Sequence, residues 1–300
     1  MLDLKRLRLL SELSKRGTIA EVATVVGYTP SAISQSLTQL ERETGVALLE
    51  RDGRRVRLTP AAHGLVAATD RVLAELDAAE AALAAEHESV RGEVVIGSFP
   101  SAAAGLVVPA VAALTQRHAD LAITVREHEP EDGIPLLRSG ALDLLVSESY
   151  DGVPHAPAGG LEEHRLLTEP LQLVAATDVS SELSAHRDAA WIAGLAGTQF
   201  AAALETACAN AGFTPRVVHR ADDARLIHTL VAAGLGIALL PALACEPSPH
   251  VRHLTVTPSP PRRHVHALAR RGATRRPALA AALDALGEVR PRSYSAASPH

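Results

Sequence analysis

Residues 18–58, TIAEVATVVGYTPSAISQSLTQLERETGVALLERDGRRVRL, contain the pattern that decides the fold of the N-terminal part of the chain. Thr18 and Glu21 form a capping box, in which the threonine hydroxyl accepts from a free backbone N–H and the glutamate reaches back to the cap. A short helix therefore begins here and ends near Gly27. Leucines at helical spacing predict an earlier helix over residues 3–15, so two helices precede the central part of this stretch.

A third helix starts at the capping residue Thr29, with Pro30 in the first position, and runs to about Thr44. Apolar residues at Ile33 and four and seven positions further on face its core, and the opposite face is polar but barely charged. Short hydroxyl and amide side chains can approach phosphates and hydrogen-bond base edges in a major groove. An ordinary solvated helix face is the alternative. The candidate DNA-binding residues on this helix are Thr29, Pro30, Ser31, Ser34, Gln35 and Thr38.

Residues 48–58 predict two short strands around an Asp-Gly pair, which is a typical hairpin turn. Arg54 lies at the predicted tip and Arg55 points outward from the second strand. A basic hairpin beside a helix-turn-helix is typical of a DNA-binding wing that reaches the phosphate backbone or the minor groove. Residues 1–60 therefore predict a winged helix-turn-helix domain.

The net charge of −5 is distributed unevenly. Residues 1–60 carry a net charge of +3, and the remaining 240 residues carry −8. A polyanion such as DNA is thus favoured as a partner only for the N-terminal end, and the small excess supports that reading without establishing it.

Residues 61–90 predict a long, alanine-rich helix that begins after Thr59-Pro60. At about 1.5 Å per residue it extends some 45 Å, which is too long to fold back on a small domain. Its larger apolar residues follow the alternating spacing of a two-stranded coiled coil, with weaker seam positions at Thr69 and Ala79. A homodimer follows, and packing of the helix within its own chain is the alternative. The candidate dimerisation residues are Leu65, Val72, Leu76 and Leu83.

At this point the chain resembles the LysR-type transcription regulators. The resemblance rests on the three helices, on Leu40-Glu41 and Gly45, on the stretch from Leu48-Leu49 to Thr59-Pro-Ala61, and on the glycine-rich Leu230–Pro241. The chain departs from the family pattern at the start of the third helix and in the displaced glycine at position 64, which puts the operator sequence in doubt. The resemblance implies binding of promoter DNA, a small-molecule effector such as an organic acid or amino acid, and self-association as a homodimer or homotetramer.

From residue 91 the pattern alternates strand and helix, which predicts a largely parallel sheet with helices on both faces. The family resemblance implies a two-lobed effector domain like a periplasmic binding protein over residues 91–290. Lobe 1 is then about 91–160 with 265–290, and lobe 2 about 161–264. Residues 291–300 are rich in Ser, Pro and Ala and predict a disordered tail.

Ligands of open α/β sheets bind beyond the carboxyl ends of the strands, where helix N-termini favour anions. Hydroxyl residues follow the predicted strands at these places, and simple helix capping without a ligand is the alternative for each. The helix N-termini favour an anionic effector group. The candidate effector-binding residues are Ser98, Phe99, Ser101, Ala102, Ser147, Thr198 and Phe200.

The sequence contains no motif of a hydrolase elbow, a phosphate-binding loop, a zinc protease or a dinucleotide site, so we expect no catalysis and no cofactor. Cys208 and Cys245 are predicted to be buried and inert, with a redox-sensing pair as the alternative, and the 14 histidines match no zinc spacing. The charged start lacks the apolar run of a signal peptide, and no long apolar run follows, which predicts a cytoplasmic protein.

Overall fold

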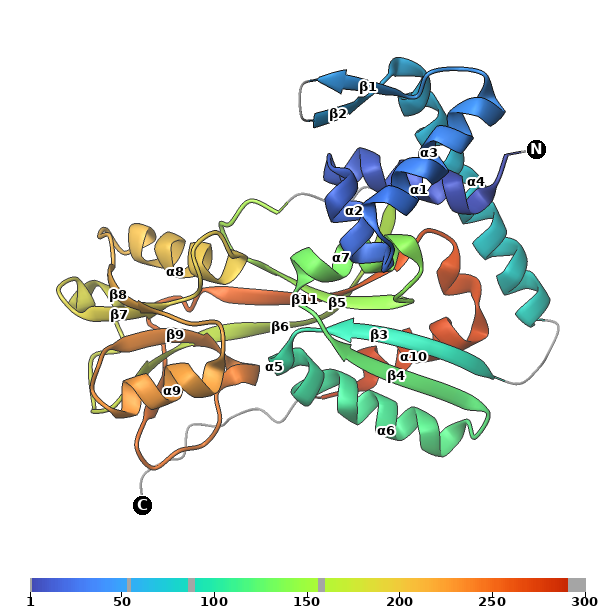
Figure 1. Ribbon diagram of the computed structural model, residues 1–300. Coiled ribbons are helices and arrows are strands. Elements are labelled where there is room, and N and C mark those ends of the chain that lie inside the picture. The colour runs from blue at the N-terminus through green and yellow to red at the C-terminus, as the bar shows by residue number, and fades with distance from the viewer. Residues whose placement is uncertain (1, 53–54, 86–89, 156–159, 291–300) are drawn as a thin grey trace.

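The computed structural model describes residues 2–52, 55–85, 90–155 and 160–290. It has three parts in chain order: a small helical domain with a β-hairpin, a long helix, and an elongated α/β domain (Figure 1). The predicted tail over residues 291–300 lies outside the described residues.

The N-terminal domain contains α1 (Leu4–Arg16), α2 (Ile19–Val26) and α3 (Pro30–Thr44). The two predicted hydroxyl caps form: the Thr18 hydroxyl accepts from the N–H of Glu21 at 3.3 Å, and the Thr29 hydroxyl from that of Ala32 at 3.3 Å. Of the predicted capping box, the described bonds contain this half and not the return bond from the Thr18 N–H to the Glu21 carboxylate. The inner faces of the helices meet in one core, which includes Leu10, Leu13, Val22, Ile33, Leu37 and Leu40.

The hairpin consists of β1 (Leu49–Asp52) and β2 (Arg55–Leu58), paired antiparallel. The Oε1 atom of Glu41 accepts from the N–H groups of Leu48 and Leu49 at 2.9 and 3.0 Å. One carboxylate at the end of α3 therefore fixes the direction in which the hairpin leaves the helix.

The long helix α4 (Pro60–Ala85) packs its first turns on α1, where Ser11 donates to the Oδ1 atom of Asp70 at 2.8 Å. Further along, α4 also contacts η4 (Ala273–Arg275) and α10 (Pro277–Glu288) of the α/β domain.

Lobe 1 has β3 (Gly92–Ser98) parallel to β4 (Leu121–Glu127) and β5 (Leu144–Tyr150). One face is covered by α10 together with a continuous helical segment of α5 (Pro100–Ala102), the π-helical η1 (Ala103–Val107) and α6 (Val108–Arg117). On the other face α7 (Pro130–Ser139) packs on β5 through Leu137 and Leu145.

Lobe 2 has β7 (Ala190–Ala193) parallel to β8 (Arg216–Arg220) and β9 (Ile237–Pro241). On one face α8 (Gln199–Asn210) packs around the fully buried Trp191, and on the other α9 (Ala224–Ala232) packs around Ile192. Short elements complete it: η2 (Leu183–His186), η3 (Ala242–Ala244) and β10 (Arg252–Thr255).

Two strands run through both lobes, so the sheet is continuous in the order β4-β3-β5-β11-β6-β9-β7-β8, with β10 paired to β6. β6 (Leu161–Ala175) pairs with β11 (Arg262–Arg270) as far as Pro170 and with β9 from Leu171 onward. β6 therefore belongs to both lobes, whereas the sequence placed its first half in lobe 2.

The prediction of a largely parallel sheet was wrong, because β11 lies antiparallel to both β5 and β6, and β6 antiparallel to β9. β6 and β11 are the connections between the lobes. The alternation of strand and helix in the sequence does not reveal the direction of these two strands. In the part of the chain that the structure describes, no helix is both long and apolar enough to cross a membrane.

Candidate functional site

The outer face of α3 presents its polar residues to solvent. All six candidates on this helix, Thr29, Pro30, Ser31, Ser34, Gln35 and Thr38, are exposed. The structure thus separates a buried apolar stripe from a continuous polar face, as the helical spacing predicted. Tyr28, just before the cap, is also 61% exposed, and sequence reasoning did not select it.

The predicted wing is only partly described. Arg54 lies outside the described residues, and Arg55 is described only as a backbone position in β2, paired with Asp52. Arg57 is exposed on the same strand. The hairpin therefore forms, and the direction of its two candidate arginines stays a prediction.

The candidate dimer seam divides into two parts. Leu65 packs partly buried against the core of its own N-terminal domain, and Thr69 is buried with its hydroxyl bonded to the Leu65 carbonyl at 2.8 Å. Val72 and Leu76 are instead 52% and 38% exposed, and the side chain of Leu83 lies outside the description. The described apolar surface left uncovered on α4 thus begins at Val72.

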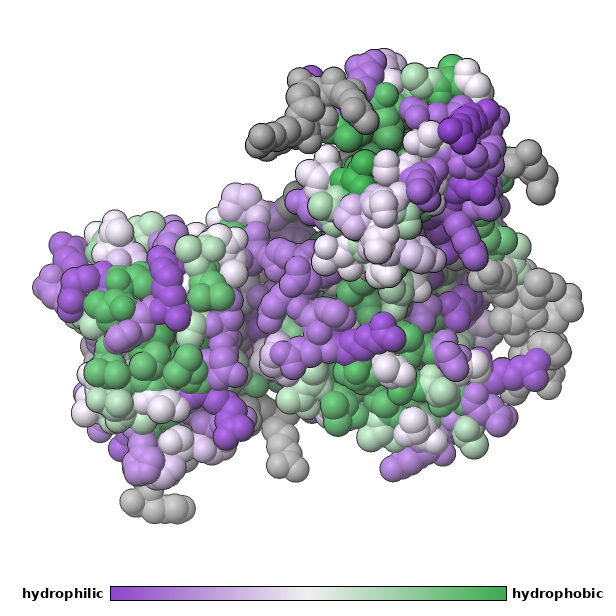
Figure 2. Space-filling model, viewed as in Figure 1, coloured by the Kyte–Doolittle hydropathy of each residue, from purple (hydrophilic) through white to green (hydrophobic). Residues whose placement is uncertain are grey.

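A cavity of about 380 Å³ lies between the two lobes. Its lobe 1 wall comes from the end of β3, the start of α7 and the end of β5, and its lobe 2 wall from the starts of α8 and α9 and the end of β9. Figure 2 shows hydrophilic surface gathered where the lobes meet. The cavity is at the carboxyl ends of the parallel strands, where ligands of open α/β sheets bind.

Four of the seven candidate effector residues line this cavity: Phe99, Ser101, Thr198 and Phe200. Ser98, Ala102 and Ser147 are buried and do not line it. The Ser98 hydroxyl donates to the Phe99 carbonyl at 3.1 Å. Because side chains alternate along a strand, Glu148 and not Ser147 reaches the cavity from β5.

The Thr198 hydroxyl is already used in the fold. It accepts from the N–H of Ala201 at 3.1 Å and donates to the carbonyl of Leu195 at 2.9 Å. This geometry is that of a helix cap, which was the alternative for this residue in the sequence. What Thr198 offers a ligand is its place at the start of α8.

Arg263, on β11, is the centre of a buried network at the base of the cavity. Its guanidinium donates to Glu169 from Nε and Nη2 at 2.8 and 2.6 Å, and to Glu148 from Nη1 at 2.9 Å. Both Nη atoms also donate to the Ser101 hydroxyl at 3.2 Å. A guanidinium has five N–H donors, so all five are engaged.

The charges of this network fix its protonation. Burial alone would lower the pKa of Arg263, but the Glu169 and Glu148 carboxylates raise it above its ordinary value. Burial raises the pKa of Glu148, against the opposing effect of Arg263 and of the Tyr150 hydroxyl, which donates to it at 2.9 Å. The Arg263 guanidinium also lies 5.0 Å from the centre of the Phe99 ring.

Apart from Arg263, the titratable side chains that line the cavity are mostly acidic, and Glu148 among them is the partner of Arg263. Arg263 is the sole basic residue among the described residues that line the cavity, against six acidic ones: Glu129, Glu131, Asp132, Glu148, Asp222 and Asp223. Asp223 caps α9 by accepting from the N–H of Leu226 at 2.7 Å, and Asp222 accepts from that of Leu195 at 2.9 Å. The cavity therefore offers many acceptors and no uncommitted guanidinium.

Glu129 shows the effect of this charge. Burial first, and then the carboxylates of Glu148, Asp222 and Glu131, together raise its pKa to about 7. Glu129 is on lobe 1 and Asp222 on lobe 2, so carboxylates of opposite lobes repel one another across the cavity.

Sequence reasoning missed the acidic residues and Arg263 because it searched strand ends for hydroxyl groups that could cap helices. Two signals were present: the acidic pair Asp222-Asp223 before a predicted helix, and Glu148 two positions beyond the strand predicted to end at Val146. No local signal marks Arg263, whose partners are 94 and 115 residues away in the chain.

Two family models match the chain. Residues 4–63 match "Bacterial regulatory helix-turn-helix protein, lysR family", and residues 87–291 match "LysR substrate binding domain". An uncharacterised transcriptional regulator of Shigella flexneri, YfeR, is 27% identical over 251 residues, covering 81% of this chain and 79% of the relative. The hydrogen peroxide-inducible genes activator of Escherichia coli O6:H1 is 28% identical over 262 residues, covering 82% and 81%.

Among solved structures, a full-length OxyR variant from Pseudomonas aeruginosa is similar with a TM-score of 0.67. The two chains are 20% identical, and the match covers 100% of this chain and 99% of that chain. At this identity the likeness shows a shared fold from the N-terminal helices to the α/β domain.

We predict that Glu129 makes the stability of the protein depend on pH. Its folded pKa of about 7 exceeds the ordinary value of 4.5, so the folded state holds a proton that the unfolded state releases. The contribution to stability is complete below about pH 4.5 and is lost as the pH rises through 7. Glu129→Gln should raise the free energy of unfolding at pH 8 by about 1 kcal/mol, since solvent screening reduces the full effect.

Urea unfolding at pH 5 and pH 8 measures this difference. The exposed Asp188→Asn, outside the cavity, is the control and should leave the pH dependence unchanged. An equal dependence on pH in wild type and Glu129→Gln would show that Glu129 titrates normally.

Proposed function

Because this chain belongs to the LysR family of bacterial DNA-binding transcription regulators, we propose that it controls promoters in response to a cationic small molecule bound between its lobes. The observation that carries the proposal is the cavity wall, where six carboxylates face one arginine whose donors are all engaged. The ligand class that fits is an amine or guanidine.

The sizes of the electrostatic energies favour a cationic ligand over the anionic ligand that the helix N-termini suggested. A helix N-terminus contributes about 1 kcal/mol to an anion. A carboxylate 4 Å from a ligand charge contributes about 4 kcal/mol at an effective dielectric constant of 20. Because Glu148 and Glu169 neutralise Arg263, the other acidic residues of the cavity wall determine which sign of ligand charge the cavity favours. An organic acid would gain little here and would meet several like charges.

The size and the remaining lining describe the ligand further. A cavity of about 380 Å³ takes a small molecule, and Phe99 and Phe200 add aromatic surface from opposite lobes. An aromatic ring attracts a cation over its face, so these rings suit an amine with a short apolar stem.

α7 supplies a route from the cavity to the DNA-binding domain. Its first residues, Pro130, Glu131 and Asp132, line the cavity, and the helix packs on α1 and α2 (Figure 1). At its last turn Arg138 is partly buried in the electrostatic field of Glu12 and Asp70, which belong to α1 and α4. A ligand that shifts α7 therefore acts directly on the placement of the helix-turn-helix.

Such a ligand switches transcription only if it binds one arrangement of the lobes more tightly than another. Above about pH 7, where Glu129 is ionised, its repulsion from Asp222 favours separated lobes in the empty state. A cation between them removes the repulsion and favours closure.

For DNA, we propose that the exposed face of α3 lies in the major groove, with Ser34, Gln35 and Thr38 toward base edges. Thr29 and Ser31 at the N-terminus of the helix are placed for phosphate contact, and Arg54 and Arg55 of the wing would add sequence-independent affinity. Tyr28, exposed beside this helix start, extends the same surface.

We further propose that two copies pair through α4 from Val72 onward. Val72 and Leu76 are exposed on a helix that otherwise packs on its own chain, which suits a second copy of the same helix. Leu65 then supports the N-terminal domain instead of the dimer.

Peroxide sensing, named for the Escherichia coli relative, is a second candidate that the described cysteines do not favour. Cys208 and Cys245 are buried in different core clusters, and burial raises the pKa of each thiol to about 12. Reaction with peroxide needs a thiolate that solvent can reach.

The α3 proposal predicts that Gln35→Ala lowers specific DNA affinity about tenfold, because a good amide contact to a base contributes about 1–3 kcal/mol. Gln39→Ala is the matched control, since Gln39 lies on the same helix but is bonded to Glu43. Promoter fragments recovered by genome-wide binding-site mapping serve as the DNA in anisotropy titrations. Equal losses in both variants would mean that α3 is presented to DNA by another face.

The cation proposal predicts that agmatine and cadaverine raise the melting temperature and alter promoter affinity, and that glutarate of similar length does neither. Asp222→Asn should weaken amine binding about tenfold, the factor that 1.4 kcal/mol represents, because it removes the charge and keeps the acceptor for the Leu195 N–H. Asp188→Asn is the control. Tighter binding of glutarate than of either amine would contradict the proposal.

The dimer proposal predicts that Leu76→Glu gives a monomer in sedimentation, because burying two like charges at the seam costs several kcal/mol, on the order of 3. The exposed Leu195→Glu, in lobe 2, is the control and should stay associated. An intact Leu76→Glu dimer with full promoter affinity would place the dimer contact elsewhere.

A further inference from the structure

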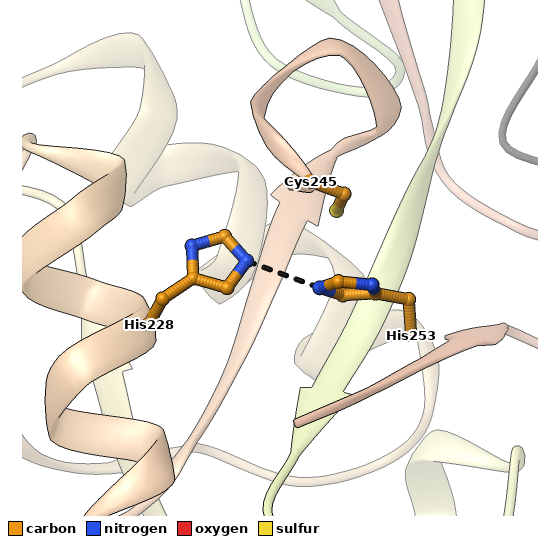
Figure 3. Close-up of side chains that lie close together, drawn as sticks. All are labelled: His228, Cys245 and His253. Carbon is orange, nitrogen blue, oxygen red and sulfur yellow. Dashed lines mark hydrogen bonds between the residues drawn. The ribbon is translucent and has the colours of Figure 1, made fainter. Parts of the chain in front are cut away.

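Three side chains that carry metal-ligating atoms come together in lobe 2 and do not line the cavity between the lobes. They are His228 on α9, Cys245 directly after η3, and His253 on β10. Figure 3 shows the two imidazole rings nearly perpendicular and joined through their Nε2 atoms, with the Cys245 sulfur turned toward the same space. In the part of the chain that the structure describes, this is the one group of three such residues gathered closely enough to share an ion.

The distances are close to those of a metal centre. The two Nε2 atoms are 3.0 Å apart, and all three ligand atoms lie within 4.8 Å of one another. Imidazole nitrogens bound to one zinc ion at about 2.0–2.1 Å and tetrahedral angles stand about 3.3 Å apart. The two imidazole nitrogens would need to separate by a few tenths of an ångström, and the cysteine sulfur would move by up to about 1 Å, to bring the three atoms onto one ion.

A second contact orients His228 as a ligand. Its Nδ1 atom lies 2.7 Å from the carbonyl of Ala224, one turn earlier in α9. A carbonyl can only accept, so Nδ1 carries the proton and Nε2 of the neutral ring keeps its lone pair toward the cluster. Metal-ligating histidines are held in this way, by a carbonyl or carboxylate on the other ring nitrogen.

The other two groups fit the same chemistry. The Nε2 atom of His253 lies 3.0 Å from the Nε2 of His228, which holds the lone pair, so in the absence of an ion His253 donates this hydrogen bond and its proton moves to Nδ1 when Nε2 binds the ion. Cys245 is fully buried, and its thiol keeps its proton in the absence of an ion because burial raises its pKa to about 12. On binding, the S–H bond breaks, a metal–sulfur bond forms and the proton leaves to solvent.

We propose that His228, Cys245 and His253 form a binding site for one thiophilic d10 metal ion of the Zn²⁺ or Cu⁺ kind. Two imidazoles and a thiolate are soft to borderline donors, which select these ions over Mg²⁺ and Ca²⁺. Both histidines are partly exposed, which gives the ion a path to the buried sulfur. Three protein ligands leave one position for water on Zn²⁺, or complete a trigonal Cu⁺ site.

The position gives the ion a structural effect that can be measured. It would join α9, the segment after η3 and β10, three elements whose side chains otherwise meet in the apolar core around Ile227 and Val251. Cross-linking these elements in the folded state stabilises it by mass action, so the melting temperature rises with free metal.

Metal binding to the full-length protein tests the proposal. Equilibrium dialysis with Zn²⁺, and with Cu⁺ under reducing conditions, should each give one ion per chain, and Mg²⁺ should give none. Co²⁺ as a spectroscopic probe should show a thiolate-to-metal charge-transfer band in the near ultraviolet. Stoichiometric binding of either d10 ion supports the site.

Substitutions of the individual residues test which side chains bind the metal ion. Cys245→Ala and His253→Gln should each lower Zn²⁺ affinity about 100-fold and abolish the Co²⁺ charge-transfer band or shift its ligand field. Cys208→Ala, the other buried cysteine, and His250→Ala, an exposed histidine nearby, are the matched controls and should bind as wild type does. His253→Gln tests a half-buried position, so it stays informative where Cys245→Ala disturbs the core.

Several results would overturn the proposal. They are no stoichiometric Zn²⁺ or Cu⁺, Co²⁺ binding without a charge-transfer band, or full affinity in both Cys245→Ala and His253→Gln. In each case His228 and His253 are a neutral hydrogen-bonded pair and no metal site exists. None of these measurements uses DNA or an effector, so their failure leaves the proposed regulatory function untouched.

Discussion

The buried guanidinium of Arg263 holds the sensing domain together where its two lobes join. It lies on β11 and bonds to Glu148 on β5, to Glu169 on β6 and to Ser101 at the start of α5. Glu169 in turn accepts from the N–H of Leu243 at 2.6 Å, which reaches into lobe 2. Removing one partner of such a buried ion pair leaves an uncompensated charge and costs about 3–5 kcal/mol. The network therefore sets both the geometry at the base of the cavity and the charge that a ligand meets there.

This constraint is the reason why the proposed ligand is a cation although an arginine lies at the base of the cavity. A guanidinium recognises carboxylates through its planar N–H donors, and here the protein's own carboxylates and Ser101 occupy them. The acidic residues at the starts of α7 and α9 have no such partner among the described residues of the cavity wall. Because α7 also contacts α1 and α2, the charge state of the wall and the placement of the DNA-binding domain depend on the same helix.

Local features of the sequence were sufficient for the elements and for the N-terminal domain. Caps such as Thr18 and Thr29 act within three residues, and the apolar spacing of α3 determines which side is buried, so both could be predicted. The cavity could be placed only to the level of strand ends. Its charge depends on Arg263 meeting residues about a hundred positions away, and the direction of β6 and β11 depends on pairing across the whole domain. Interactions of that range have no local pattern, so Arg263 could not be found, whereas Glu148 was passed over for Ser147 because strand ends were searched for hydroxyl groups.

The two proposed ligand sites of lobe 2 share one short helix, and this has a thermodynamic consequence. Asp223 caps α9 at the cavity, and Ala224, which lines the cavity, also accepts the hydrogen bond that orients His228. Cys245 likewise follows directly on Ala244, another lining residue. Any movement of α9 on lobe closure therefore changes the distance between His228 and the other two ligands. By linkage, an ion that binds one arrangement more tightly changes the affinity for the cavity ligand by the same factor as that ligand changes the affinity for the ion. Lobe 2 is built so that the two sites cannot be independent unless α9 stays fixed.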